Sequence, residues 1–187
     1  MRSKKLKIVL FGDPVLRQRA KPVTVFHRKL DSIIDSMTET LFSREDAAAL
    51  AANQVAILKR IIVIDYEDEY FEMINPEIIF SDGLITAFEG CLSYPGYVGM
   101  VPRAEYVKVR FLNREGEVQV IERQGRMARC IQHEIDHLDG ILFVDRMNEE
   151  FLIRSGTEEQ IEKSEVLKII EEGERIKENI PLLQIEP

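Results

Sequence analysis

The stretch Gln132-His133-Glu134-Ile135-Asp136-His137 is the most informative part of this sequence, and it lies within residues 127–138, which have helical apolar spacing. Residues four positions apart share one face of a helix, so His133 and His137 can point at one metal ion. Glu134 follows His133 directly and can reach a water bound to that metal. The alternative interpretation is a pair of partly buried histidines on a packed helix, but the spacing favours metal binding.

A third protein ligand is needed, because two imidazoles do not complete a metal site. No histidine follows His137, and Phe143 stands where a third histidine would be expected after Gly140. The remaining candidates are a thiolate and a carboxylate. Cys91 is followed by Pro95 and Gly96 and lies on a turn at the predicted end of a strand, which makes it a candidate ligand. The alternative for a lone cysteine is a small buried apolar residue.

Cys130 lies three residues before His133, on nearly the same helical face. We expect it to line the site rather than bind the metal, because Cys91 has the better sequence context. A disulfide between the two cysteines is disfavoured by the cytosolic location expected below. The competing carboxylate hypothesis is a gluzincin-like peptidase, in which the third ligand comes from one of three downstream residues, Glu158, Glu159 or Glu162.

The rest of the chain predicts strands in the middle and helices around them. Residues 60–66 form a β-branched run typical of a buried strand, and residues 72–80 predict a strand that is kinked or at an edge because of Asn75-Pro76. Alternation over residues 105–112 and 117–122 predicts a hairpin. Helices are expected over residues 29–44, 127–138 and 158–178. Without a βαβ rhythm, this order indicates an α+β fold with antiparallel sheet.

Composition narrows the class of protein. The 187 residues include 25 Lys and Arg against 33 Asp and Glu, a net charge of −8, so we expect no nucleic-acid partner. The apolar run Leu6–Phe11 is shorter than a secretory segment or the roughly 20 residues of a membrane span. Residues 148–187 hold 11 acidic and 5 basic side chains, so six of the eight negative charges lie there. A cytoplasmic protein without membrane contact is expected.

Three segments together resemble the peptide deformylase family: Ala47–Gln54, Glu89–Ser93 and Gln132–His137. The resemblance covers roughly residues 6–147, with the segments in the family's order and spacing. It implies antiparallel sheets around a central metal-binding helix, with N-terminal and C-terminal helices. It further implies a catalytic domain over residues 1–147, with residues 148–187 as an acidic, mainly helical extension of the same domain.

The family resemblance also implies a reaction. Deformylases remove the N-formyl group from the initiator methionine of new polypeptides, so the expected partners are N-formylmethionyl nascent peptides in a bacterial cytoplasm. By similarity, the metal ligands are Cys91, His133 and His137, and the ion is Fe²⁺ natively, with Ni²⁺, Co²⁺ or Zn²⁺ able to replace it. Glu134 is the expected general base and then acid. The Gln54 side-chain amide and the Leu92 backbone N–H are expected to stabilise the oxyanion.

The resemblance places six residues at substrate-binding positions: Ala48, Ala49, Glu89, Gly90, Arg129 and Cys130. Of these, the methionine pocket would be lined by Ala48, Arg129 through its aliphatic stem, and Cys130. Glu89 and Arg103 occupy positions that often pair in the family, and we expect a buried ion pair that holds the Cys91 turn.

The sequence departs from the family where alanines replace glycines at positions 47, 49 and 56. Glycine at such places usually indicates positive φ or close backbone approach. We therefore expect weaker turnover or an altered side-chain preference, unless the backbone is extended enough to accept alanine. A non-catalytic or weakly active deformylase-like protein is the alternative function. A basic C-terminal helix docks some relatives on the ribosome, but the acidic residues 148–187 argue against this mode of contact.

Overall fold

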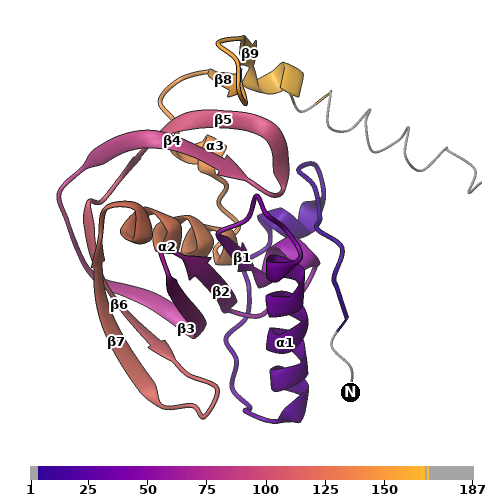
Figure 1. Cartoon of the computed structure of the whole chain (residues 1–187), viewed down its shortest axis with the longest axis vertical. Coiled ribbons are helices and arrows are strands. Elements are labelled where there is room, and N and C mark those ends of the chain that lie inside the picture. The colour runs from indigo at the N-terminus through magenta and orange to yellow at the C-terminus, as the bar shows by residue number, and fades with distance from the viewer. Residues whose placement is uncertain (1–3, 167, 169–187) are drawn as a thin grey trace, which may run out of the picture.

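The structure is a computed structural model that describes residues 4–166 and residue 168 (Figure 1). Its elements follow in the order η1 (Pro14–Arg17), α1 (Arg28–Phe42), β1 (Ala49–Ala51), η2 (Ala52–Val55), β2 (Ile61–Tyr66), β3 (Glu69–Asp82), β4 (Ile85–Cys91), β5 (Tyr94–Arg103), β6 (Tyr106–Leu112), β7 (Val118–Gln124), α2 (Gly125–Leu138), α3 (Phe143–Arg146), β8 (Phe151–Arg154) and β9 (Gln160–Glu162). No described helix is long and apolar enough to cross a membrane.

The strands form two sheets, with the orders β1-β2-β3-β6-β7 and β4-β5-β8-β9. Every pair of neighbouring strands in these sheets is antiparallel. Helix α2 lies between the two sheets, and α1 packs at the side of the five-stranded sheet (Figure 1). The expected α+β fold with antiparallel sheets around a central helix is therefore confirmed.

Strand β2 is buried on both faces, which explains why its sequence is a continuous apolar run. Ile62 and Ile64 pack in one core with α2, whereas Ile61 and Val63 pack in another core with α1. All four side chains are fully buried. Each such side chain stabilises the fold by about 1.5–3 kcal/mol relative to an exposed one. One strand thus anchors both helices to the sheet.

Strand β3 has the kink that Asn75-Pro76 predicts. Asn75 has a φ of 52°, and the register with β6 shifts between Ile74 and Glu77. The alternative of an edge position is wrong, because β3 pairs with β2 on one side and β6 on the other. The Asn75 side chain donates to the Val23 carbonyl and accepts from the Val23 N–H, both at 2.8 Å, so the bulge holds the preceding loop.

The hairpin and two of the predicted helices are confirmed with small changes at their ends. Strands β6 and β7 pair from Tyr106–Gln124 to Leu112–Val118, on either side of the predicted turn. Helix α1 begins one residue earlier and ends two residues earlier than the sequence predicts. Helix α2 covers the predicted segment and begins two residues earlier, at Gly125.

The prediction of a helix over residues 158–178 is wrong for its first residues. Residues 160–162 form strand β9, which pairs with β8, and β8 in turn pairs with β5. Ile161 and Leu152 are buried in the core that lies against β5, while Gln160 and Glu162 are exposed, so the local period is two. Residues 163–166 and 168 are helical. Three apolar residues of the predicted helix lie outside the described residues: Ile169, Ile170 and Ile176.

Candidate metal centre

Helix α2 has two buried sides, one apolar and one that carries the histidines. One face carries apolar side chains that pack on the five-stranded sheet: Met127, Ala128, Ile131, Ile135 and Leu138. The histidines project from another part of the same helix, with ring centroids 4.8 Å apart. The helix ends at Leu138, and Gly140 follows with a φ of 76° and so little room that a Cβ would meet the Arg17 carbonyl oxygen at 2.5 Å. Packing on both sides therefore fixes the histidines.

Cys91 reaches the same place from the other sheet. It is the last residue of β4 and follows a register shift between Gly90 and Cys91. Such a shift changes the direction in which the next side chain points. Its Sγ lies 3.2 Å from His137 Nε2. Ligand atoms of Cys91, His133 and His137 all lie within 4.8 Å of one another. One thiolate and two imidazoles form a donor set that suits several divalent transition metals.

The tautomer of His133 is set by a carboxylate. Its Nδ1 lies 2.9 Å from Glu89 Oε2 and donates to it, which leaves Nε2 with a lone pair for a metal. His137 differs, because its buried Nδ1 has no hydrogen-bond partner among the described residues. The two ligands are therefore held by different means: His133 by a hydrogen bond and His137 by packing.

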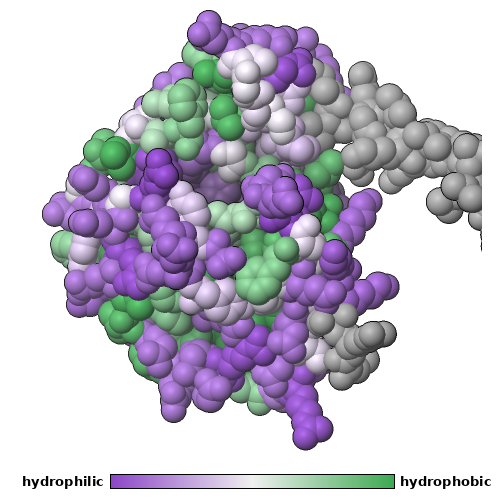
Figure 2. Space-filling view, viewed as in Figure 1, coloured by the Kyte–Doolittle hydropathy of each residue, from purple (hydrophilic) through white to green (hydrophobic). Residues whose placement is uncertain are grey.

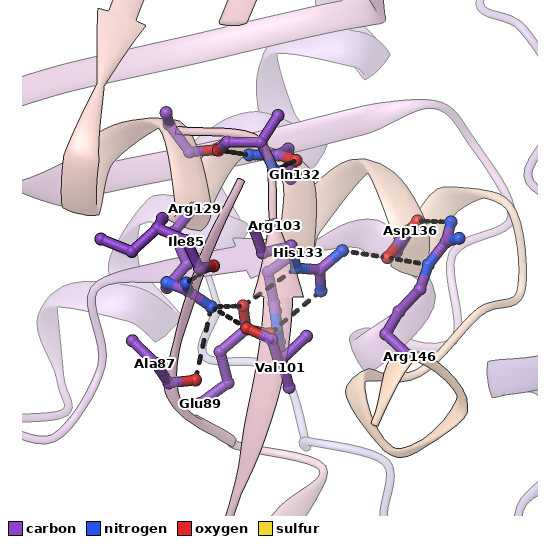
Figure 3. Close-up of polar contacts among 12 residues, drawn as sticks. Ile85, Ala87, Glu89, Val101, Arg103, Arg129, Gln132, His133, Asp136 and Arg146 are labelled. Atoms are coloured by element: carbon purple, nitrogen blue, oxygen red, sulfur yellow. Dashed lines mark hydrogen bonds and ion pairs between the residues drawn. The ribbon is translucent and has the colours of Figure 1, made fainter. Parts of the chain in front are cut away.

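Glu89 is the centre of a buried network of charges (Figure 3). Arg103 donates to both of its carboxylate oxygens, at 2.9 and 3.0 Å, and Arg129 donates to Oε1 at 2.8 Å. Burial by itself raises the pKa of Glu89, but the hydrogen bonds from His133 and Arg103 outweigh it and bring the pKa to about 2. The expected buried ion pair between Glu89 and Arg103 is confirmed.

Asp136 extends this network along the helix. Arg103 donates to Asp136 Oδ2, and Arg146 donates to both oxygens of Asp136, at 2.7 and 3.0 Å. Arg103 therefore bridges a carboxylate of β4 and a carboxylate of α2. The sequence analysis missed the role of Asp136, although its place inside the 132–137 stretch was a signal.

Glu134 is buried beside the candidate ligands. Its Oε2 has no hydrogen-bond partner among the described residues. Burial raises the pKa of Glu134 to about 7, against a smaller opposite effect of His133. A buried carboxyl group with a free oxygen is suited to exchange a proton with a reactant at neutral pH.

Gln54 points its side chain toward Cys91. It belongs to η2, and its Oε1 accepts from the Ala51 N–H at 2.9 Å, which orients the amide. Its Nε2 then lies 3.4 Å from Cys91 Sγ and 3.3 Å from the buried Ser93 Oγ. Sequence reasoning missed Ser93, whose position in the Glu89–Ser93 stretch was the available signal. Leu92 lies between Cys91 and Ser93 in the same turn, and its side chain packs on the core around α1.

Of the three alanines that replace family glycines, Ala47 and Ala49 have ordinary backbone angles and Ala56 does not. Neither Ala47 nor Ala49 has a positive φ, and Ala49 pairs with Ile64 in strand β1, so neither position has the left-handed backbone that would favour glycine. Ala56 has a φ of 58° in the left-handed region, where its Cβ costs about 1 kcal/mol relative to glycine. Ala48 is half-buried, and its carbonyl accepts from the Asp65 N–H at 2.8 Å.

The side chain of Glu89 lies inside the protein, as its predicted pairing with Arg103 requires. Its carboxylate is buried and bound by Arg103, Arg129 and His133, so it faces the interior. Gly90 is exposed next to Cys91. The Arg129 guanidinium is bound to protein acceptors rather than free in solvent.

Both cysteines are free thiols, which agrees with the expected absence of a disulfide. Burial raises the pKa of the Cys130 thiol. The carboxylate alternative for the third ligand is wrong, because the described group of candidate ligands around the histidines contains Cys91. Glu158 and Glu162 are exposed, and the Glu159 carboxylate pairs with Arg154 at 2.6 Å.

Residues 5–151 match the family described as polypeptide deformylase. The chain belongs to the peptide deformylase family. A peptide deformylase from Caldanaerobacter subterraneus subsp. tengcongensis is 50% identical over 136 residues, which are 73% of this chain and 85% of that protein. The family consists of metal-dependent hydrolases that remove the N-formyl group, so the activity expected from the sequence is confirmed at this level.

Solved deformylase structures share the fold. One from Legionella pneumophila has a TM-score of 0.79 at 35% identity and covers 95% of this chain and 99% of its own. A class I type b peptide deformylase from Acinetobacter baumannii, bound to Met-Ala-Ser, has a TM-score of 0.74 at 38% identity, with 78% of this chain and 100% of its own covered. The fold expected from the family resemblance is therefore confirmed.

Proposed function

We propose that this chain hydrolyses the formamide of N-formylmethionyl nascent peptides at one divalent metal ion held by Cys91, His133 and His137. The observation that carries the proposal is the convergence of these ligand atoms within 4.8 Å of one another, beside a buried Glu134 with a free oxygen. When bound, the ion supplies Lewis acidity toward a water and a carbonyl oxygen.

Glu134 moves the proton. Its free Oε2 takes a proton from the attacking water as the new C–O bond forms. It then delivers that proton to the amine as the formamide C–N bond breaks, so that formate and a free methionyl amine leave. Proton transfer by a positioned side chain contributes about 10²–10⁴-fold to such a reaction.

Gln54 and Leu92 are the proposed donors to the oxyanion. The Gln54 amide is oriented by the Ala51 N–H, so its Nε2 faces the Cys91 side of the site. The backbone N–H of Leu92 follows Cys91 directly in the chain. Donors that are held in place before the reaction stabilise developing charge without reorganisation.

The donor set also bears on the metal and the substrate. A thiolate with imidazoles accommodates Fe²⁺ as well as Ni²⁺, Co²⁺ and Zn²⁺, and we propose Fe²⁺ natively. A thiolate beside Fe²⁺ makes the activity sensitive to oxygen.

We propose a bacterial cytoplasmic location, because polypeptides that begin with formylmethionine are made there. Ala48, Ala49, Gly90, Arg129 and Cys130 remain the proposed substrate side of the site. Any transient ribosome contact would not use a basic C-terminal helix, because residues 148–187 are acidic.

The test is formate release from formyl-Met-Ala-Ser by the nickel-loaded full chain. Glu134→Ala should lower kcat by about 10²–10⁴-fold. Cys91→Ser should abolish activity together with tight metal binding. The matched control is Glu115→Ala, which removes an exposed glutamate of the β6–β7 turn and should leave kcat unchanged. A metal-loaded wild type that releases no formate would instead support the non-catalytic alternative.

A further inference from the structure

The candidate ligands come from two elements that the sheets do not tie together. The histidines belong to α2, and Cys91 belongs to β4, which within the described part of the chain is an edge strand that pairs with β5 alone. The β4–β5 register also shifts between Gly90 and Cys91, so the regular ladder ends before the thiol. Strand pairing alone therefore does not set the distance between Cys91 and the helix.

Arg129 joins these two elements. It lies four residues before His133 on α2, and its side chain is only 12% exposed. Its Nη2 donates to the Ile85 carbonyl at 2.8 Å, at the beginning of β4. Its Nη1 donates to Glu89 Oε1 at 2.8 Å and lies 3.5 Å from the Ala87 carbonyl, so three β4 residues share one guanidinium (Figure 3).

The same guanidinium reaches the neighbouring strand. Nη1 donates to the Val101 carbonyl of β5 at 2.9 Å. A planar guanidinium presents five donors in a fixed fork, whereas a lysine presents one compact ammonium group. Arginine reaches Glu89 and Val101 through Nη1 and the Ile85 carbonyl through the separate atom Nη2. A lysine has one nitrogen and cannot occupy both of these positions.

We propose that Arg129 is a positioning residue that ties edge strand β4 to helix α2 and thereby sets the separation of the Cys91 thiolate from His133 and His137. The inference rests on the proposed function, because it concerns the same metal centre. This task belongs to the guanidinium, which faces the β4–β5 hairpin, and it is separate from the proposed lining of the substrate side by the aliphatic stem.

Removal of Arg129 should leave the fold intact. Glu89 would keep both hydrogen bonds from Arg103, so the buried carboxylate would not lose its counter-charge. Ile85 is an exposed residue, and water can replace the donor at its carbonyl. The expected consequence is therefore a looser distance between β4 and α2 rather than unfolding.

The experiment compares wild type, Arg129→Met and Arg129→Lys as full chains loaded with Co²⁺. Methionine keeps an unbranched apolar side chain, and lysine keeps the charge beside Glu89. The matched control is Arg126→Met, an exposed arginine three residues earlier on the same helix. The readouts are the thiolate-to-cobalt absorption band, the rate of metal loss to a chelator, and kcat and KM for formyl-Met-Ala-Ser.

Both Arg129 variants should shift or weaken the cobalt–thiolate band and lose metal about 10-fold faster or more. Their kcat should fall while KM changes little, and Arg126→Met should match wild type in every readout. Three results would overturn the inference: an unchanged band with a raised KM, full rescue by lysine, or a wild type without a thiolate band. A wild type that shows an Arg129-dependent band but releases no formate would support the inference and overturn the proposed function.

Discussion

The buried network at α2 and the solvent-facing side of the five-stranded sheet contain the same kind of interaction in opposite surroundings. Arg103 and Glu89 have side chains that are each 4% exposed. Arg110 and Glu77 are cross-strand partners on β6 and β3, and their side chains are 54% and 59% exposed. Figure 2 shows hydrophilic residues over much of the visible surface. Other exposed pairs are Lys108–Glu122 and Arg154–Glu159.

The difference lies in what each pair does for the molecule. An exposed pair competes with water and is worth about 0–1 kcal/mol. A buried pair does not necessarily add net stability, but loss of one partner leaves a charge without solvent, which costs about 3–5 kcal/mol. The buried network therefore has a role other than stability: it holds His133 and joins strands β4 and β5 to helices α2 and α3.

The largest predicted effect comes from Arg103→Met, which removes the bridge between Glu89 and Asp136. Arg129 and Arg146 still contact these carboxylates. We therefore expect a loss near the lower end of the range, about 3 kcal/mol in the free energy of unfolding. The measurement is urea denaturation of the metal-free protein. Arg110→Met is the control and should cost about 1 kcal/mol or less. Equal losses for the two variants would remove the distinction between the regions.

A smaller effect is expected from Glu89→Gln, which keeps the shape but weakens the acceptor of His133 Nδ1. Loss of such an outer partner typically lowers metal affinity about 10–100-fold. The measurement is the Kd for Zn²⁺ by competition with a chelator. Glu77→Gln removes the same charge from the exposed side and should leave the Kd unchanged. An unaltered Kd for Glu89→Gln would show that the hydrogen bond does not tune the ligand.

The smallest effect is the coupling within the exposed pair. A double-mutant cycle of Arg110→Ala and Glu77→Ala should give a coupling free energy of about 0.2–1 kcal/mol. Because the pair is solvated, the coupling should decrease further between low salt and about 1 M NaCl, where the Debye length is only about 3 Å. A coupling that is larger than this range, or insensitive to salt, would mean that the sheet surface behaves like the buried network.

Local patterns predicted most of the fold because their causes are local. The run of residues 60–66 and the alternation of residues 105–122 correspond to β2 and to the β6–β7 hairpin. The helix prediction is wrong at residues 158–162, because a charged segment with scattered apolar residues is compatible with both a helix and a strand. Pairing with β8 and burial of Ile161 decide for a strand there. The β8–β9 pair is local in sequence, but the core that buries Ile161 includes residues as distant as Leu16 and Tyr94, which no short window of sequence contains.

By itself, the sequence determined the metal-binding helix and its candidate chemistry, since the i, i+4 spacing of His133 and His137 is a property of any α-helix. It also indicated Cys91 through the turn around it. Only the tertiary structure decided how the three are held: the donation from His133 to Glu89 and the fork of Arg129 across β4 and β5. The physical reason is range. Helical spacing follows from bonds along the chain, whereas Glu89 acquires its buried partners only when the β4–β5 hairpin packs against α2.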